Sequence, residues 1–316
     1  MSVFTSLGCL VFLCISMAFK VNAKQLAFSS TSVPEGQSFN YTWKREDTEY
    51  NLSFTLDTEA FKRMPSSSAA FSNALMQREI EIALLKYAQN LDPREAKVDI
   101  KRVGKNLQYG VSSRNEEKAR DIMKALDEAG NQAKADYFKR SYFTKYSGPS
   151  GADAVKQDHV RYAKESADAL MPVVEAIKTI QDNANDAREF IEIALSWMQS
   201  IPYDVMENRL SSNGAGFVSP KDLLLQNQGD CDSKATFLAA LLQAYNQGVK
   251  QNMVLLPEHA LLAVALNPQP NDEFITHKGL TYILLEAAGP GYFAVGEASD
   301  STLLKIRNRQ YTLEQM

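Results

Sequence analysis

The sequence predicts an α+β protein with two domains behind a short leader, and the three segments span residues 1–23, 24–150 and 151–316. Two observations predict this fold class. The first half alternates hairpin-like and helical patterns in the order ββαββα, whereas the second half places helices first and strands afterwards. The densest run of turn-forming residues, Ser147–Gly151, lies between the halves and predicts the domain boundary.

The composition is that of an ordinary folded protein. The chain has 316 residues, of which 45% are hydrophobic, and this excludes a disordered, coiled-coil or multi-span membrane protein. A chain of this length commonly forms two domains. Its 34 Lys and Arg against 38 Asp and Glu give a net charge of −4, and such mild acidity argues against a nucleic-acid partner.

The chain begins with an apolar run, residues 3–19, that is followed by the small-residue pattern Val21-Asn22-Ala23. This arrangement predicts a secretory signal peptide, so we expect a periplasmic or secreted protein. No basic residue precedes the run and Lys20 follows it, so an uncleaved N-terminal anchor is the alternative; we expect no other membrane span. Cleavage after Ala23 leaves Cys231 as the single cysteine, and one thiol cannot form an internal disulfide.

Two hairpins and two helices make up the predicted N-terminal domain. Apolar residues alternate over 39–43 and 50–56, and again on either side of Gly104-Lys105-Asn106. Helical stripes run between Ala69 and Leu91 and from Asn115 onward. We expect both helices to pack on one face of one sheet. No catalytic spacing occurs here, so the role of residues 24–150 is open, with an inhibitory cover over a cleft as one possibility.

The predicted C-terminal domain opens with helices over 154–180 and 186–200. A short helix starts at Ser219-Pro220, because serine is a favoured N-cap and proline fits the first helical position. A longer apolar helix follows Gly229. The remaining apolar runs predict strands over 253–256, 260–266, 280–285, 293–295 and 303–306.

Cys231 lies at the predicted start of the long helix. Free backbone N–H groups and the positive end of the helix dipole favour a thiolate at that position, and the thiolate is the nucleophilic form of cysteine. The alternative is a small buried hydrophobic residue. The flanking residues Asp230, Asp232, Ser233 and Lys234 are polar, which is unusual around a core cysteine.

A thiol nucleophile needs a base, and the mature chain offers three histidines. His159 lies in a charged helical stretch and is expected on the surface, whereas His277 is expected in a hairpin loop. His259 stands at the leading end of a strand, and Glu286 closes the strand that follows. If these strands pair antiparallel, His259 and Glu286 become neighbours, and the carboxylate can orient the imidazole.

The order of these residues resembles that of the bacterial transglutaminase-like cysteine enzymes, relatives of the papain-like fold. The resemblance covers about residues 185–300 and is most specific in the Gly-Asp-Cys-Asp-Ser-Lys-Ala sequence around Cys231. It implies a helical half and an antiparallel sheet, with Cys231 as nucleophile and His259 as general base. Glu286 stands where the family more often has Asp, and Leu261 stands where an aromatic residue is often found.

The resemblance implies acyl transfer from an amide of a protein or peptide substrate through a thioester, by hydrolysis or by transfer to an amine. Candidate oxyanion donors are the backbone N–H of Cys231 and the side chains of Gln226 and Gln228. We expect no cofactor and no metal, because no nucleotide-binding motif and no paired ligand spacing occurs. A catalytically silent fold that serves as a binding or envelope-assembly module is the competing hypothesis.

Overall fold

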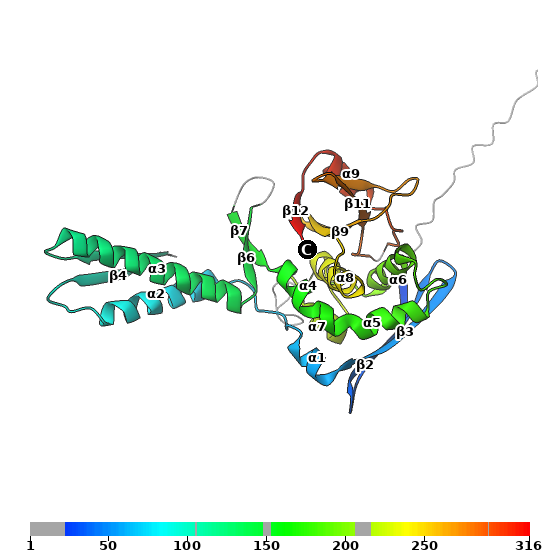
Figure 1. Ribbon diagram of the computed structural model, residues 1–316, viewed down its shortest axis with the longest axis horizontal. Helices are drawn as coiled ribbons and strands as arrows, with labels where there is room; N and C mark the ends of the chain where they lie inside the picture. The colour runs from blue at the N-terminus through cyan, green and yellow to red at the C-terminus, as the bar shows by residue number, and fades with distance from the viewer. Residues whose placement is uncertain (1–22, 105, 148–152, 206–215, 290) are drawn as a thin grey trace, which may run out of the picture.

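The computed structural model describes residues 23–104, 106–147, 153–205, 216–289 and 291–316, and it is a mixed α+β protein. The predicted leader therefore lies almost wholly outside the described residues. Figure 1 shows a layered body with a long arm on one side. The elements in chain order are β1 (Lys24–Val33), β2 (Gly36–Arg45), β3 (Thr48–Asp57), α1 (Thr58–Arg63), α2 (Asn73–Gln89), β4 (Lys97–Val103), β5 (Asn106–Ser112), α3 (Glu116–Arg140), β6 (Phe143–Ser147), β7 (Asp153–Gln157), α4 (His159–Ala167), a 3-10 turn (Asp168–Leu170), α5 (Met171–Thr179), α6 (Ala187–Ser200), α7 (Pro220–Gln226), α8 (Cys231–Tyr245), β8 (Gln251–Leu256), β9 (His259–Ala265), β10 (Phe274–His277), β11 (Leu280–Leu285), α9 (Asp300–Arg307) and β12 (Thr312–Gln315).

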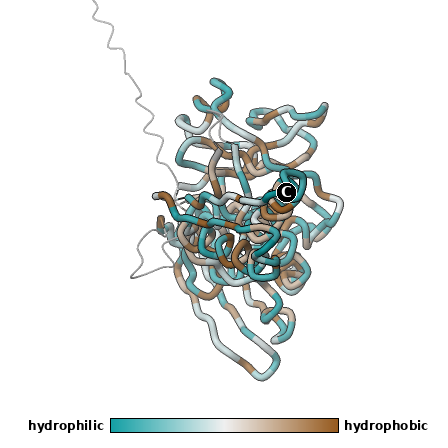
Figure 2. Tube along the Cα trace, turned by 90° about the vertical axis from the view of Figure 1, so that its left-hand side faces the viewer, coloured by the Kyte–Doolittle hydropathy of each residue, from teal (hydrophilic) through white to brown (hydrophobic). Residues whose placement is uncertain are grey.

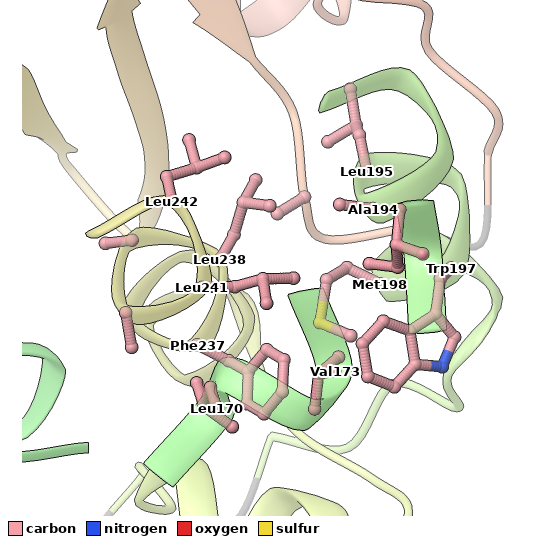
Figure 3. Close-up of a cluster of buried hydrophobic side chains, with 14 of the residues drawn as sticks. Leu170, Val173, Ala194, Leu195, Trp197, Met198, Phe237, Leu238, Leu241 and Leu242 are labelled. Carbon is pink, nitrogen blue, oxygen red and sulfur yellow. The ribbon is translucent and has the colours of Figure 1, made fainter. Parts of the chain in front are cut away.

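Three layers form the body. A sheet in the order β1-β2-β3 lies below a helical layer of α4 to α8, and a sheet in the order β10-β11-β9-β8-β12 lies above it (Figure 1). All named strands pair antiparallel. One continuous hydrophobic core joins the layers, because apolar side chains of β2, β3, α5, α6, α8, β9 and β11 belong to the same buried cluster. Figure 3 shows its central part, where α8 meets α6.

The first three strands belong to this body and not to a separate N-terminal domain. The ring of Tyr41 lies edge-on to Trp197 of α6 with centroids 5.0 Å apart, and Phe54 contacts the same indole at 5.9 Å. Trp43 donates a buried hydrogen bond to Ser196, with 3.0 Å between Nε1 and Oγ. The predicted hairpin is therefore present, but its apolar face is covered by helices that lie more than 100 residues further along the chain.

The arm consists of α2, β4, β5 and α3, and it points toward the viewer in Figure 2, where the chain is coloured by hydropathy. The strands β4 and β5 pair only with each other, so the two predicted hairpins form two sheets and not one. Leu84, Ile122 and Leu126 close a small core between the two helices. The predicted ββαββα elements correspond to β2, β3, α2, β4, β5 and α3, but β1 and α1 were not predicted. The single sheet was also wrong, because the first hairpin finds a larger apolar surface on the body.

The predicted domain boundary falls between two strands that pair with each other. Phe143 is opposite Gln157, and Ser147 is opposite Asp153. Residues 148–152 lie outside the described part of the chain. The segment 153–157 is thus a strand, although the pattern predicted helix from 154, and the helix begins only after Asp158, whose side chain accepts the Arg161 backbone N–H. The packing therefore separates a body from an arm, and the boundary between them does not lie at residue 150.

Pairing in the upper sheet places the beginning of β9 beside the end of β11, because Leu285 is opposite Leu262. This is the antiparallel arrangement expected from the sequence. Two predicted strands are absent. Residues 293–295 form a loop, and residues 303–306 lie in α9, where Ser299 caps the helix by accepting the Thr302 N–H. Leu303 and Ile306 pack on the outer face of the sheet. They are three residues apart, so one face of a helix buries both, and the run does not need to form a strand.

Helix α8 has little contact with solvent over its first three turns, because every residue from Ser233 to Leu242 is buried. A helix that is apolar on all sides must lie inside a protein. The position of this helix determines where Cys231 lies, because its N-terminus ends beside β8, β9 and the residues that precede α7. None of the described helices is long and apolar enough to cross a membrane.

We predict that Leu52→Ala lowers the free energy of unfolding of the whole body by about 2–5 kcal/mol, because Leu52 is 1% exposed inside the shared core. Trp43 and Trp197 are the only tryptophans and both lie in this core, so their fluorescence reports its unfolding in urea. Leu75→Ala on the exposed face of α2 is the control and should change the value by less than about 0.5 kcal/mol. Unchanged stability in Leu52→Ala would contradict the shared core.

Candidate active site

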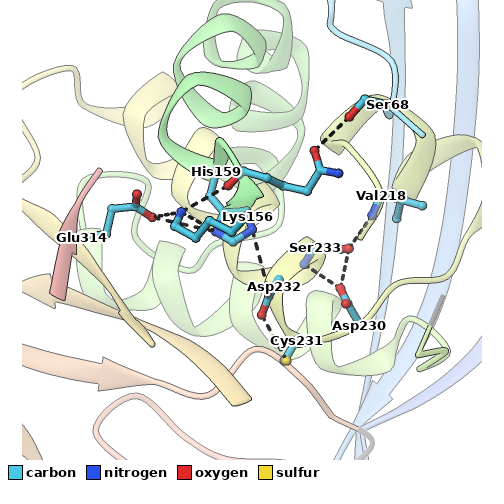
Figure 4. A network of polar contacts seen from close by, with 10 residues as sticks. Ser68, Lys156, His159, Val218, Asp230, Cys231, Asp232, Ser233 and Glu314 are labelled. Carbon is cyan, nitrogen blue, oxygen red and sulfur yellow. Dashed lines mark hydrogen bonds and ion pairs between the residues drawn. The ribbon is translucent and has the colours of Figure 1, made fainter. Parts of the chain in front are cut away.

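Cys231 is the first residue of α8, as the sequence predicts, and it is a free thiol that is 7% exposed. Asp230 is the N-cap. Its carboxylate accepts the Ser233 backbone N–H at 2.9 Å and the Ser233 hydroxyl at 2.5 Å. The Ser233 hydroxyl in turn accepts the Val218 N–H at 2.8 Å. These bonds fix the start of the helix and thereby the position of the thiol (Figure 4).

His259 and Glu286 are hydrogen-bonded neighbours. The imidazole Nε2 lies 3.0 Å from Oε1 and 2.9 Å from Oε2 of Glu286, whose side chain is almost fully buried. The carboxylate thus fixes the ring orientation and holds a proton on Nε2. The other ring nitrogen, Nδ1, has no hydrogen-bond partner among the residues that the structure describes. It is therefore free to exchange a proton with a group in the cavity.

One cavity of about 410 Å³ brings Cys231 and His259 together. The backbone N–H of Ala260, the residue after His259, hydrogen-bonds the Cys231 sulfur. His259 also lines a second cavity of about 330 Å³, which contains Glu286 and the start of α9. The imidazole therefore stands between two solvent-accessible spaces, and only the first of them contains the thiol.

The thiol does not have the lowered pKa that its place at a helix N-terminus suggests. Burial raises the pKa of Cys231, and the nearby charges of Asp232 and Asp230 raise it further. The Ala260 N–H acts in the opposite direction but is outweighed. Removal of the thiolate from water opposes ionisation more strongly than the helix dipole favours it. In the resting protein the sulfur is therefore protonated.

The pKa of His259 is raised above its ordinary value. Burial lowers it, but the hydrogen bond and charge of Glu286 outweigh burial, and Asp232 adds to the increase. A raised pKa means that the imidazolium is stabilised by its surroundings. The pair is therefore able to accept a proton from the thiol and to keep it during a reaction.

His159 is buried and is not on the surface as the charged sequence around it suggests. It is 2% exposed, and its Nε2 lies 3.6 Å from Asp232. The other carboxylate oxygen of Asp232 accepts from the Cys231 sulfur at 3.4 Å (Figure 4). Burial, with the charge of Lys156, lowers the pKa of His159 well below its usual value, so this histidine is neutral.

Lys156 lines this cavity and is paired with Glu314, with 2.7 Å between the ammonium and a carboxylate oxygen. This ion pair joins β7, from the middle of the chain, to β12, near its C-terminal end. The sequence pattern missed it because residue 156 was expected in a helix. Only the folded chain brings the two residues together.

The remaining predicted residues lie elsewhere. Gln226 ends α7 and is exposed, Gln228 is half-buried, and neither lines the cavity. His277 ends β10 beside a two-residue turn, as expected of a hairpin. Leu261 packs in the apolar cluster on the outer face of the upper sheet, so its side chain points away from the thiol.

Tyr203 is the residue that the sequence did not single out. Its hydroxyl hydrogen-bonds the Cys231 sulfur, and burial together with the charges of Cys231 and Asp230 raises the pKa of Tyr203 to about 12. A short bridge between Tyr203 and Gly229 holds it beside the start of α8. The one available signal was the Ile201-Pro202-Tyr203 sequence at the end of a helix, which has no distinctive pattern by itself.

Among the described residues no cluster of three or more His, Cys, Asp or Glu side chains has the geometry of a metal site. The comparisons with known proteins add no assignment, because no family model, no curated protein and no solved structure matches this chain. The arrangement of the side chains is thus the basis for any functional inference.

We predict that Asp232→Asn increases the rate at which iodoacetamide alkylates Cys231 at pH 8 by about tenfold. The substitution removes a negative charge that raises the pKa of the thiol, and one pKa unit corresponds to a factor of ten in thiolate at a pH below the pKa. Alkylation of the mature chain is followed by intact mass. Asp300→Asn on α9 is the control, and an unchanged or slower rate in Asp232→Asn would contradict the prediction.

Proposed function

We propose that the protein is an exported thiol enzyme that acts on amide bonds of a protein or peptide through Cys231, His259 and Glu286, in a transglutaminase-like domain. The observation that carries the proposal is the bonding of His259. Both oxygens of Glu286 lie within 3.0 Å of Nε2, Nδ1 has no hydrogen-bond partner among the described residues, and His259 lines the cavity that contains the thiol. A nucleophile, a base and an orienting carboxylate are the three parts of such a site.

The reaction begins when an amide carbonyl enters the cavity. The Cys231 thiol gives its proton to Nδ1 of His259 as the sulfur–carbon bond forms, and the carbonyl oxygen becomes an oxyanion. Glu286 stabilises the imidazolium that results. Because the resting thiol is protonated, proton transfer and attack occur together and the thiolate does not exist beforehand.

The tetrahedral intermediate then expels the amine, which takes the proton from His259, and a thioester to Cys231 remains. Water or a second amine attacks this thioester, His259 accepts its proton, and the thiol is restored. Water gives hydrolysis and an amine gives transfer. His259 can receive either acceptor, since it also lines the cavity on its other side.

Two donors are available for the oxyanion. One is the backbone N–H of Cys231 at the start of α8, as proposed from the sequence. The second is the Tyr203 hydroxyl, which already hydrogen-bonds the sulfur and can shift to an oxygen bound to the adjacent carbon. We propose Tyr203 in place of Gln226 and Gln228, because neither glutamine lines the cavity.

The competing function is a catalytically silent binding or envelope-assembly module. The observation that favours it is the thiol itself, which is 7% exposed and has a raised pKa. A silent protein would keep the fold without forming an acyl-enzyme. The two functions are separated by acylation of Cys231, which needs no knowledge of the natural substrate.

We predict that p-nitrophenyl acetate, an activated acyl donor, acetylates Cys231, and that Glu286→Gln slows this acylation by about a hundredfold or more. The amide cannot stabilise the imidazolium as a carboxylate does, and general base catalysis commonly contributes this much. Release of p-nitrophenol and intact mass follow the reaction. Glu258→Gln is the matched control. Glu258 also lines the cavity but makes no side-chain hydrogen bond to the His259 ring, so this variant should react at nearly the wild-type rate.

Cys231→Ala must show no adduct. Acylation elsewhere in the chain, or equal rates in wild type and Glu286→Gln, would favour the silent module. Dimethylcasein with dansylcadaverine then tests amine incorporation, and fluorescent casein tests hydrolysis.

We further expect Tyr203→Phe to lower the rate of acylation at saturating p-nitrophenyl acetate by about tenfold or more, because one hydrogen bond to the oxyanion is lost. The ring and its packing are retained, so the melting temperature should hardly change. Tyr311→Phe, which is not in the cavity, is the control. A wild-type rate in Tyr203→Phe would remove it from the proposed oxyanion site.

A further inference from the structure

Lys234 is a charged side chain with no exposed surface, in the middle of the buried part of α8. It lies three residues after Cys231, and residues three apart share a face of a helix. A buried ammonium destabilises a fold unless its N–H groups are all bonded. Its partners therefore indicate why a lysine stands at this position.

Two backbone carbonyls and one aromatic ring surround the ammonium. Nζ donates to the carbonyl of Ile201 at 2.5 Å and to that of Ala288 at 2.6 Å. It also lies 5.9 Å from the centre of the Tyr203 ring, within the range of a cation–π interaction. Two of the three N–H groups of the ammonium thus have carbonyl acceptors, and the charge faces the Tyr203 ring, so one side chain contacts three separate groups.

The two carbonyls belong to the segments that carry the other parts of the site. Ile201 lies two residues before Tyr203, whose hydroxyl hydrogen-bonds the thiol. Ala288 lies two residues after Glu286, which orients His259. Gln199 also bonds the carbonyl of Glu286, at 2.8 Å, but it comes from α6. Lys234 is therefore the described side chain that bonds both of these segments directly to the nucleophile helix.

We propose that Lys234 is a positioning residue of the active site, whose buried ammonium holds the Tyr203 and Glu286 segments at a fixed distance from Cys231. This inference rests on the proposed thiol chemistry. The ammonium does not touch the substrate. It acts through Tyr203 and through the Glu286–His259 pair.

The charge of Lys234 provides a readout that simple structural support would not give. Burial lowers the pKa of Lys234 to about 7, and the negative charges of Asp230 and of the Cys231 thiolate oppose this decrease. Asp230, Cys231 and the face of Tyr203 are the groups that surround the ammonium. Because the thiolate stabilises the ammonium, the ammonium equally stabilises the thiolate. This effect is present below about pH 7 and is lost at higher pH.

The test compares Lys234→Met, which keeps the length of the side chain but has no N–H group or charge, with the wild type in the mature protein. Circular dichroism checks the fold. We expect the acylation rate at saturating p-nitrophenyl acetate to fall at least tenfold, while the KM changes less than threefold. We also expect iodoacetamide to alkylate Cys231 about tenfold more slowly at pH 6, with the difference disappearing above pH 8. Lys178→Met is the control, because this half-buried lysine of α5 pairs with Glu175 and does not line the cavity.

A folded Lys234→Met protein with the wild-type acylation rate and the wild-type pH profile of alkylation would overturn the proposal. If Lys234→Met does not fold, Lys234→Gln is used to test the proposal, because the glutamine amide keeps N–H donors but carries no charge. A folded Lys234→Gln with slower alkylation at pH 6 supports the inference, and an unchanged rate contradicts it. If the wild type is not acylated at all, the proposed enzyme fails, whereas the alkylation profiles still test the role of Lys234.

Discussion

The burial of α8 from Ser233 to Leu242 is the constraint on which the rest of the structure depends. From Phe237 to Leu242 the helix is apolar on all its sides, so it needs a cover in every direction. Other helices and the upper sheet supply that cover, and the three-stranded sheet of residues 24–57 closes the core beneath them. The N-terminal end of the helix reaches the cavity that His259 also lines, and the residue at that end is Cys231.

The electrostatics of this end are those of a site in which the nucleophile is formed during the reaction. A buried thiol beside Asp230 and Asp232 stays protonated, whereas His259 beside Glu286 is well suited to carry a positive charge. The two effects oppose spontaneous formation of a thiolate but favour transfer of its proton to the imidazole. In the reaction that we propose, a carbonyl that enters the cavity excludes water and receives the sulfur as the proton leaves. Such a site combines low reactivity toward oxidants with reactivity toward a bound acyl group.

The arm, residues 73–104 and 106–140, has a structural arrangement that the sequence pattern did not predict. Its helices have their own small core, and its base joins the β6–β7 hairpin through the cluster of Met76, Tyr137 and Phe143. The same hairpin contributes Tyr146 and Lys156 to the wall of the cavity. The arm and the site are therefore connected through one short pair of strands. The proposed inhibitory cover has no counterpart in the packing of β1 to β3, since these strands lie on the other side of the helical layer (Figure 1).

Local pattern determined most of the elements. Period-two alternation located two of the hairpins, the capping residue Ser219 located the start of α7, apolar stripes located α6 and α8, and the order of the strands placed His259 beside Glu286. Local pattern failed for residues 303–306, where three apolar residues around Lys305 fit a strand and a helix equally well. For His159, the charged neighbours predicted an exposed side chain, but the side chain is buried. A helix with charges on one face can bury its other face.

The sequence by itself thus determined much of the secondary structure and the candidates for thiol, base and acid, because each depends on neighbours along the chain. Tertiary structure decided which apolar faces meet, and for that reason the first hairpin joined the body. It also decided the ionisation of Cys231, since desolvation and the charges of Asp230 and Asp232 outweigh the helix dipole only when the helix is buried. The contacts of Lys234 were likewise decided by the tertiary structure. Its partners are two backbone carbonyls and an aromatic ring from segments distant in the sequence, and no side-chain pattern predicts such contacts.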